Sequence, residues 1–333
     1  MRLVPEPGPL RLLSVSTLVN TFGNGLFYTS AALFYTRSIG LSPSQVGVGL
    51  TVAGLLSLLV GIPAGHLADL RGAREVLMAL LVAQGLALAS MALVHSLGAF
   101  VVVVTAFACL DKANNAVRQG LVARALPADQ RVSGRAYLRS LTNLGIGAGS
   151  VFAGFAIAAD TRAAYLSLIF GDAVTYVLAA VATARLPATA HADRRTGGRM
   201  LVAVRDRPFL VVTLVNAALS MHFAILEIGV PLWVDRRTSA PTWMVAVLFL
   251  VNTTCCVLFQ VRASRGAVDV ATAAVVMRRG ALLLAASYLV FAASAGRSTP
   301  VAVVVLVVAT LVNVAGELEQ SAGSWGLGFG LAR

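Results

Sequence analysis

The chain is poor in charged residues, which make up only 12% of its 333 residues, whereas 58% are hydrophobic. A soluble domain carries about twice that charged fraction, and the mean hydropathy of this chain is positive, +0.84. The net charge of +12 is scattered over short segments and forms no basic stripe or domain, which argues against a nucleic-acid partner. The composition therefore predicts an all-α membrane protein that has the lipid bilayer as its surroundings.

Residues that build catalytic and metal centres are equally sparse. Cys109, Cys255 and Cys256 lie in apolar stretches and the four histidines are dispersed, so we expect no disulfide framework and no metal site. Lys112 is the only lysine and follows an aspartate, so there is no Walker A motif, and no Gly-x-Ser-x-Gly elbow occurs. The sequence predicts a protein without a cofactor that is not an enzyme.

Ten apolar segments dominate the chain, and each is long enough to cross a bilayer as a helix. They cover roughly 12–36, 45–65, 75–95, 98–123, 137–159, 163–186, 209–233, 242–262, 278–296 and 300–320. A longer polar segment, 187–208, separates the first six from the last four. We therefore predict a polytopic helical bundle with a six-helix N-terminal bundle (1–186), a cytoplasmic linker (187–208) and a partial C-terminal bundle of four helices (209–333).

The arginines fall mainly on one side of this topology. With the N-terminus inside, 20 of the 25 arginines lie in inner segments. The outer loops hold Arg37, Arg162, Arg236, Arg237 and Arg297. Because positive residues accumulate on the cytoplasmic side, we predict a multi-pass protein of the plasma (inner) membrane with both termini in the cytoplasm.

Polar residues inside the apolar segments concentrate in the first, fourth, seventh and tenth segments, at spacings typical of one helical face. They include Asn20, Asn24, Tyr28, Asp111, Asn115, Asn216, Glu227, Asn313 and Glu317. A three-helix repeat whose first helix faces a shared aqueous cavity accounts for this pattern. Hydrogen bonding between neighbouring helices is the ordinary alternative. Asp172, in the sixth segment, lies outside the pattern.

Acidic residues are unfavourable inside a bilayer and are functional candidates by default. Asp111, Glu227 and Glu317 are therefore the candidates for proton coupling and substrate contact. We assign the cavity wall to six other polar residues of the four segments, which are Asn20, Asn24, Tyr28, Asn115, Asn216 and Asn313.

Glycines form a second pattern, in the fifth segment. Gly145, Gly149 and Gly154 lie within an apolar helix that no strand precedes, which excludes a phosphate-binding loop. Small residues at such spacings allow two membrane helices to cross closely.

A short charged run, Gly65–Arg74, is expected to form a tight turn between the second and third segments. Its residues Gly65, Asp69, Gly72 and Arg74, with Leu67, Ala68 and Leu77, resemble the loop 2–3 signature GxLaDrxGrkxxl of the major facilitator superfamily. The sequence departs from the signature at Leu70 and Ala73. In that family the Asp and the Arg brace the inner helix ends and control the inward gate, so the resemblance implies this role for Asp69 and Arg74.

The fifth segment is similar to the antiporter signature GxxxGPxxGG of the exporter branches. Gly145, Gly149 and Gly154 fit that signature, whereas Ser150 stands in place of the usual proline and Ala153 in place of a glycine. The resemblance implies a drug or multidrug exporter-like branch, with the proline kink lost.

The family resemblance also implies two bundles whose helices 1, 4, 7 and 10 line the cavity. The family has twelve helices, so this chain is expected to lack the last two, with a loop at 317–326. Asp69 is then expected to lack the partner that helix 11 supplies in the family.

Together these patterns predict a secondary active transporter that exports small amphipathic or drug-like compounds by proton antiport. Its expected partners are a small-molecule substrate and protons. Two alternatives remain: uptake of a polar small molecule, and a truncated membrane protein that does not transport.

Overall fold

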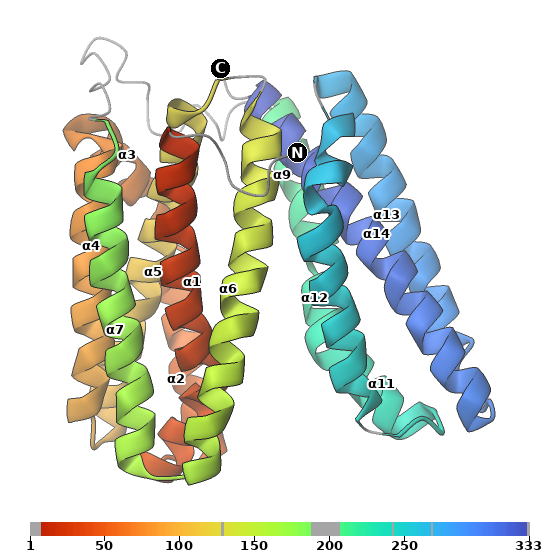
Figure 1. Ribbon diagram of the computed structural model, residues 1–333, viewed down its shortest axis with the longest axis horizontal. Coiled ribbons are helices and arrows are strands. Elements are labelled where there is room, and N and C mark those ends of the chain that lie inside the picture. Colours follow the sequence, from red (N-terminus) through yellow and green to blue (C-terminus); the bar gives the residue numbers. More distant parts are fainter. Residues whose placement is uncertain (1–7, 128–129, 188–206, 242, 268, 332–333) are drawn as a thin grey trace. The chain divides into compact units, whose positions relative to one another are not determined.

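The computed structural model describes residues 8–127, 130–187, 207–241, 243–267 and 269–331 (Figure 1). Every regular element in these ranges is a helix, which confirms the predicted all-α fold. The chain forms two compact units, one of Met1–Ala128 and Leu141–Met200, the other of Asp129–Ser140 and Leu201–Arg333. Most of the predicted linker lies outside the described residues, so the division at 187–208 stays a prediction.

The first unit contains the first six predicted segments, except for the beginning of α6. Its helices are α1 (Pro9–Leu33), η1 (Phe34–Ser38), α2 (Pro43–Ser57), α3 (Gly61–Arg71), α4 (Ala73–Ala89), η2 (Ser90–Leu93), α5 (Leu97–Ala125), α6 (Arg131–Ala159) and α7 (Arg162–Ala184). Ser42 and Gln45 form a capping box before α2, and Ser96 and Thr161 cap α5 and α7. These side chains satisfy backbone amides at the helix starts and so fix where each loop ends.

The second predicted segment is bent. Helices α2 and α3 differ in direction by 45° across a short break. Helix α3 continues to Arg71, and Gly72 alone separates it from α4. Gly72 has a φ of 94°, a conformation that favours glycine. The prediction of a turn along the whole of Gly65–Arg74 is therefore wrong, because one glycine reverses the chain and the residues before it stay helical.

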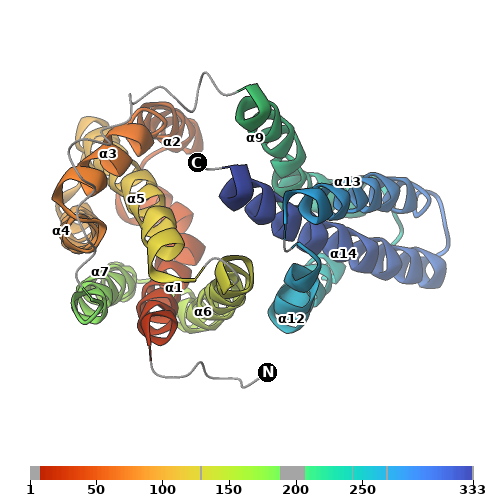
Figure 2. The same ribbon diagram turned by 90° about the horizontal axis from the view of Figure 1, so that it is seen from above.

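The predicted outer loops of the first unit meet at one end. Arg37, after α1, forms a 2.7 Å ion pair with Asp160, between α6 and α7. Arg162 Nη2 donates to the carbonyl oxygen of Ala92, in η2, at 3.2 Å. Viewed from above, α7 lies beside α1 and α4, while α5 lies beside α2 and α4 (Figure 2). The helices therefore run alternately up and down, as a multi-pass topology requires.

The second unit is also helical. Its elements after α6 are α9 (Arg207–Ser220), α10 (His222–Ala224), η5 (Ile225–Gly229), α11 (Val230–Arg237), α12 (Met244–Ala263), η6 (Ser264–Gly266), α13 (Val270–Ala292) and α14 (Thr299–Leu331). The seventh predicted segment is thus interrupted, and η5 is a π-helix with a wider turn than an α-helix.

Helix α14 continues through 317–326, where the sequence predicted a loop. Two polar residues of this stretch have partners: Glu317 binds Arg139 and Asn252, and Gln320 Nε2 donates to Asn216 Oδ1 at 2.7 Å. Glycine lets α14 lie against α13, because a Cβ on Gly316 would lie only 2.8 Å from the backbone nitrogen of Leu284. The loop prediction is wrong because polarity and glycine here serve helix packing.

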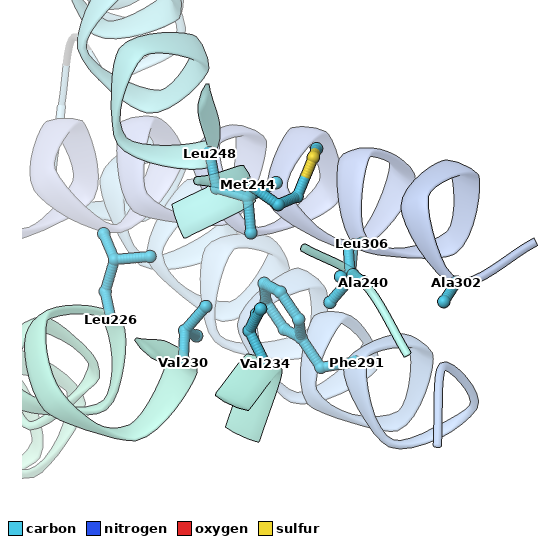
Figure 3. Packing of buried hydrophobic residues seen from close by; sticks show 10 residues of the cluster. Leu226, Val230, Val234, Ala240, Met244, Leu248, Phe291, Ala302 and Leu306 are labelled. Atoms are coloured by element: carbon cyan, nitrogen blue, oxygen red, sulfur yellow. The ribbon is translucent and has the colours of Figure 1, made fainter. Parts of the chain in front are cut away.

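A cluster of buried apolar side chains joins α11, α12, α13 and α14 in the second unit (Figure 3). It comprises Leu226, Val230, Val234, Ala240, Met244, Leu248, Phe291, Ala302, Leu306 and Ala309. Trp233 Nε1 beside it donates to Phe291 O and Ser294 Oγ, both at 3.1 Å. Since lipid is as apolar as these side chains, close packing contributes more to this contact than exclusion of water.

By length and composition, seven described helices can each cross a membrane, and the bent α2–α3 pair makes an eighth. The other two predicted spans correspond to α1 with η1, which carries a polar stripe, and to the interrupted α9–α11 segment. All ten predicted segments are therefore helical. The two that do not meet the criteria of length and apolar composition are the first segment, which carries the polar stripe, and the seventh, which is interrupted.

Candidate functional site

A cavity of about 400 Å³ lies within the first unit, between α1, α2 and α5. Its wall is mostly apolar, and its aromatic members are Phe27, Tyr28, Tyr35 and Phe107. The Phe27 ring contacts the Phe107 ring at 5.6 Å between centroids, and Tyr35 at 6.4 Å, both edge-on. Such contacts hold aromatic rings in fixed positions, so the wall presents ordered ring faces and edges.

Two charged side chains, Asp111 and Lys112 of α5, line the same cavity. Asp111 is held by two amides: Gln84 Nε2 donates to Oδ1 at 3.4 Å and Asn115 Nδ2 donates to Oδ2 at 3.1 Å. Consecutive helical residues point about 100° apart, so the two charges face the cavity from different directions. The cavity can therefore bind an apolar group beside a charged one.

A chain of hydrogen bonds continues from Asp111 through the interior of the first unit. Gln84 Nε2, on α4, also donates to the hydroxyl of Tyr176, on α7, at 3.0 Å. The Tyr176 hydroxyl donates to Asn24 Oδ1, on α1, at 2.9 Å. Asn114 of α5 donates to Gln84 Oε1. Four helices are thus linked through neutral amide and hydroxyl groups.

The predicted cavity-wall residues of the first unit have different surroundings. Tyr28 lines the cavity and is 47% exposed. Asn20 is buried and accepts a hydrogen bond from Arg118 Nη2 at 3.1 Å. Asn24 and Asn115 bind Tyr176 and Asp111, as described above. Within this unit, then, the predicted stripes meet one another, and Tyr28 and Asp111 reach the cavity.

In the second unit, Glu317 is buried and paired with a cation. Arg139 Nη2 donates to Glu317 Oε1 at 2.5 Å, and Asn252 Nδ2 donates to Oε2 at 3.1 Å. Cys256 Sγ lies 3.8 Å from Glu317 Oε1. The Arg139 guanidinium also lies over the Phe223 ring, 5.3 Å from its centroid. The charge of Glu317 is therefore compensated in this structure.

The remaining candidates of the second unit do not share one site among the described contacts. Asn313 Nδ2 donates to Ser287 Oγ at 3.0 Å, whereas Asn216 binds Gln320. Glu227 lies in η5, and its side chain is outside the described part of the chain. The predicted face that joins Asn216 and Glu227 assumed a continuous α-helix; this assumption is wrong because the helix breaks between them.

The loop motif lies at the other end of the first unit from the Arg37–Asp160 pair. Asp69 forms an ion pair with Arg124 at the end of α5, and Arg74 Nη1 donates to the carbonyl oxygen of Leu186 at 2.8 Å. Asp69 therefore has a cationic partner on α5, which is a different contact from the helix-11 partner that the family resemblance implies. Gly65 has open space around its Cα, and Gly72 makes the turn.

The glycines of α6 pack against α1. A Cβ on Gly145 would lie 2.2 Å from Thr21 Oγ1, and one on Gly149 would lie 2.0 Å from the carbonyl oxygen of Phe22. These distances confirm the predicted close crossing for Gly145 and Gly149. Gly154 has open space around it and is not part of the crossing.

Sequence reasoning assigned no role to three buried polar residues: Gln84 of α4, and Asp172 and Tyr176 of α7. They lie in segments that the pattern assigned to the outside of the cavity. The sequence signal that could have identified them is a polar side chain within an apolar segment, because such a side chain needs a partner in whichever helix it occurs.

Solved structures of several transporters have the same fold. The human organic anion transporter MFSD10 (TETRAN) is 17% identical, with a TM-score of 0.62 over 96% of this chain and 91% of that chain. FucP, in the outward conformation, is 12% identical with a TM-score of 0.70 over 97% and 88%. A bacterial homologue of the iron transporter ferroportin is 13% identical with a TM-score of 0.69 over 100% and 85%.

No curated protein sequence matches this chain. The model of one family, described as the Major Facilitator Superfamily, matches residues 13–332. This match covers nearly the whole chain and agrees with the loop motif and with the fold of the solved transporters. The protein therefore belongs to the Major Facilitator Superfamily, whose members are membrane transporters and not enzymes.

Proposed function

We propose that the protein is a secondary active transporter that exports small amphipathic compounds in exchange for protons. The aromatic cavity that ends at Asp111 and Lys112 supports this proposal most strongly. Its volume of about 400 Å³ falls within the range typical of small-molecule sites, about 300–1,000 Å³. A wall of aromatic rings favours a substrate with a flat apolar part, and a carboxylate held by two amides favours one with a cationic group.

Coupling to protons needs at least one carboxyl that changes its charge between two access states. Asp111, Glu227 and Glu317 remain the candidates from the sequence. Asp111 lines the cavity, whereas Glu317 is paired with Arg139. Competition between a proton and a cationic substrate for Asp111 is the simplest form of exchange.

We further propose that the protein lies in the plasma membrane with both termini in the cytoplasm. The arginine distribution supports this orientation. The meeting of the predicted outer loops at one end of the first unit is consistent with it. The second unit agrees, since Ser239 Oγ donates to the carbonyl oxygen of Arg297 across two predicted outer loops, at 2.7 Å.

Efflux from proteoliposomes tests the proposal. The purified protein is reconstituted and loaded with a panel of cationic, neutral and anionic aromatic amphiphiles, and efflux is followed with and without a pH gradient. We expect faster efflux of cationic amphiphiles when the gradient drives protons the opposite way. If Asp111→Asn and Glu227→Gln both leave the coupling intact, the assignment of these carboxyls is wrong.

Uptake of a polar small molecule is the second candidate. The proton:xylose symporter XylE has the same fold, with a TM-score of 0.67 at 12% identity, over 96% of this chain and 80% of that chain. The cavity described here offers few hydrogen-bonding side chains, which favours the amphipathic substrate. Transport of pentoses and hexoses, measured both into and out of the vesicles, distinguishes sugar uptake from export of amphiphiles. If the folded protein moves neither class, the remaining alternative, a membrane protein that does not transport, is supported.

A further inference from the structure

The side chain of Asp172, in the middle of α7, is fully buried at the contact between α7 and α1. A Cβ added to Gly23 of α1 would lie 2.1 Å from Asp172 Oδ1 and 2.0 Å from Thr175 Oγ1. The backbone of α1 at Gly23 therefore covers the carboxyl directly. No mechanism described above uses this acid.

The polar contacts of Asp172 fit a carboxyl that carries a proton. Thr175 has one hydroxyl proton but lies near two oxygens of Asp172, the backbone carbonyl at 2.8 Å and Oδ1 at 3.0 Å. If the hydroxyl donates to the carbonyl, a proton on Oδ1 completes the second contact by donating to Thr175 Oγ1. The other oxygen, Oδ2, is buried and has no hydrogen-bond partner in the described part of the chain.

No cation compensates Asp172 among the described residues. On α1, the titratable residue nearest to Gly23 in sequence is Tyr28, and on α7 the one nearest to Asp172 is Tyr176; both are phenols. Helix α4 has only Arg74 and Glu75, which bind each other at the far end.

The other packed elements add no partner. In η1, Arg37 is paired with Asp160 at the outer end, and Tyr35 is a phenol in the cavity wall. In η2 there is no titratable residue, and on α5 the guanidinium of Arg118 binds Asn20. An ionised carboxylate at Asp172 would therefore be both desolvated and unpaired, which is strongly unfavourable.

Asp111 of the same unit has the opposite surroundings. Each of its oxygens accepts a hydrogen bond from an amide, and it borders the cavity instead of a helix contact. Two carboxyls whose surroundings favour different charge states are suited to different tasks. Asp111 is equipped to bind a cationic group when it is ionised, and Asp172 is equipped to hold a second proton away from the substrate.

We propose that Asp172 is a proton-binding site, and that it exchanges its proton when α1 moves away from α7. This proposal rests on the proposed exchange of substrate for protons. Withdrawal of Gly23 lets water reach the carboxyl; the O–H bond then breaks, the proton passes to water, and the carboxylate keeps the electron pair. Helix α1 also supplies Phe27 and Tyr28 to the cavity. One helix therefore covers the proton site and lines the substrate cavity, which gives a physical link between the two.

Infrared difference spectroscopy on the reconstituted full-length protein tests the site directly. A protonated carboxyl in apolar surroundings has a C=O stretch that is resolved from the amide bands and shifts in deuterium oxide. We expect such a band at neutral pH in the wild type and in Asp111→Asn, and its loss in Asp172→Asn. If Asp172→Asn retains the wild-type band, the proposal is overturned. This test does not depend on any measurement of transport.

Transport assays give the second test, with an amphiphile that the wild type exports. We expect Asp172→Asn to retain substrate exchange between equal concentrations but to lose all stimulation by a pH gradient. The matched control Asp160→Asn, in an outer ion pair, should keep that stimulation. If Asp172→Asn keeps the stimulation, Asp172 is not the coupling site even though the protein is an exporter.

The two proposals fail in distinguishable ways. A wild-type protein that moves no amphiphile but shows the Asp172 band contradicts the proposed function and leaves the proton site standing. If Asp172→Asn does not fold, Thr175→Val provides an independent variant. We expect it to shift the frequency of the wild-type band, because the carboxyl loses its hydroxyl partner, and an unshifted band overturns the assignment.

Discussion

In the first unit, Asp111 at the cavity and the buried Asp172 have neutral hydrogen-bond partners, whereas in the second unit the buried Glu317 is paired with a cation. Asp111 is held by amides, and Asp172 touches a single hydroxyl. Glu317 lies against the guanidinium of Arg139. A buried carboxylate that has a cationic partner keeps its charge as long as the pair lasts. A buried carboxyl without one has a charge that depends on its access to water.

This difference suggests separate tasks for the two units. The hydrogen-bond network of the first unit can respond to protons and to a charged substrate, because its neutral groups gain or lose little interaction free energy when one helix moves. The pair in the second unit is suited to holding α6, α12 and α14 together, since breaking it leaves an uncompensated charge. Arg139 lies in the part of α6 that belongs to the second unit, while the rest of that helix belongs to the first.

The largest effect that we expect comes from breaking the pair in the second unit. Arg139→Ala leaves Glu317 buried without its cation, which should lower the free energy of unfolding by about 3–5 kcal/mol. Denaturant-driven unfolding in mixed micelles measures this change. The double variant Arg139→Met with Glu317→Leu should recover most of the loss, because neither charge then remains. A single variant that unfolds like the wild type would show that the pair is not a stabilising contact.

A smaller effect is expected at the cavity of the first unit. Asp111→Asn removes the charge that a cationic amphiphile would meet, and a hydrogen bond to a charged group contributes about 1.5–3 kcal/mol. The affinity for cationic amphiphiles should therefore fall roughly 10- to 100-fold, while neutral analogues bind as before. Equilibrium binding to the purified protein measures both. Equal losses for the two ligand classes would place the carboxylate outside the binding site.

The contact between α1 and α7 supplies the next prediction. Gly23→Ala inserts a methyl group where Asp172 Oδ1 and Thr175 Oγ1 lie within about 2 Å, so we expect a loss of about 1–3 kcal/mol from overpacking. Gly147→Ala is the matched control, because open space surrounds that glycine. The free energies of unfolding of the two variants are compared, and equal values would contradict the close approach of α1 to Asp172.

The smallest effect concerns the outer ion pair. Hydrogen bonds from Arg37, and then from Tyr165, hold the pKa of Asp160 below its usual range. A carboxyl with a lowered pKa stabilises the folded state above its unfolded pKa, about 3.9, and that contribution is lost as the pH falls through the folded pKa. We expect amide exchange of the loop at Asp160 to accelerate below about pH 4. In Arg37→Ala this acid dependence should shrink, and an unchanged acid dependence would exclude the pair as its cause.

Much of the fold could be predicted from the sequence. All ten apolar segments are helical, and the polar stripes of the first and fourth segments mark residues that meet in the first unit. Periodicity works here because a lipid-facing helix must be apolar on its outer side. Asp111 and Tyr28, which line the cavity, were found by this reasoning.

The rest depends on contacts that periodicity does not contain. Gln84 and Tyr176 join two predicted stripes through helices that looked uninvolved. The continuation of α14 follows from the partners of Glu317 and Gln320, which lie far away in the sequence. The interruption at Met221 and the π-helix η5 alter the regular helical spacing on which the pairing of Asn216 with Glu227 was based, so that pairing stays a prediction.

Simultaneous measurement of substrate and proton flux in proteoliposomes tests the central claim most directly. A cationic amphiphile is released from the vesicles while an internal pH indicator follows protons. We predict that efflux of the amphiphile is accompanied by proton entry, and that Asp172→Asn abolishes the proton flux but keeps substrate exchange. Proton movement in the same direction as the amphiphile, or efflux without any proton flux in the wild type, would contradict the account.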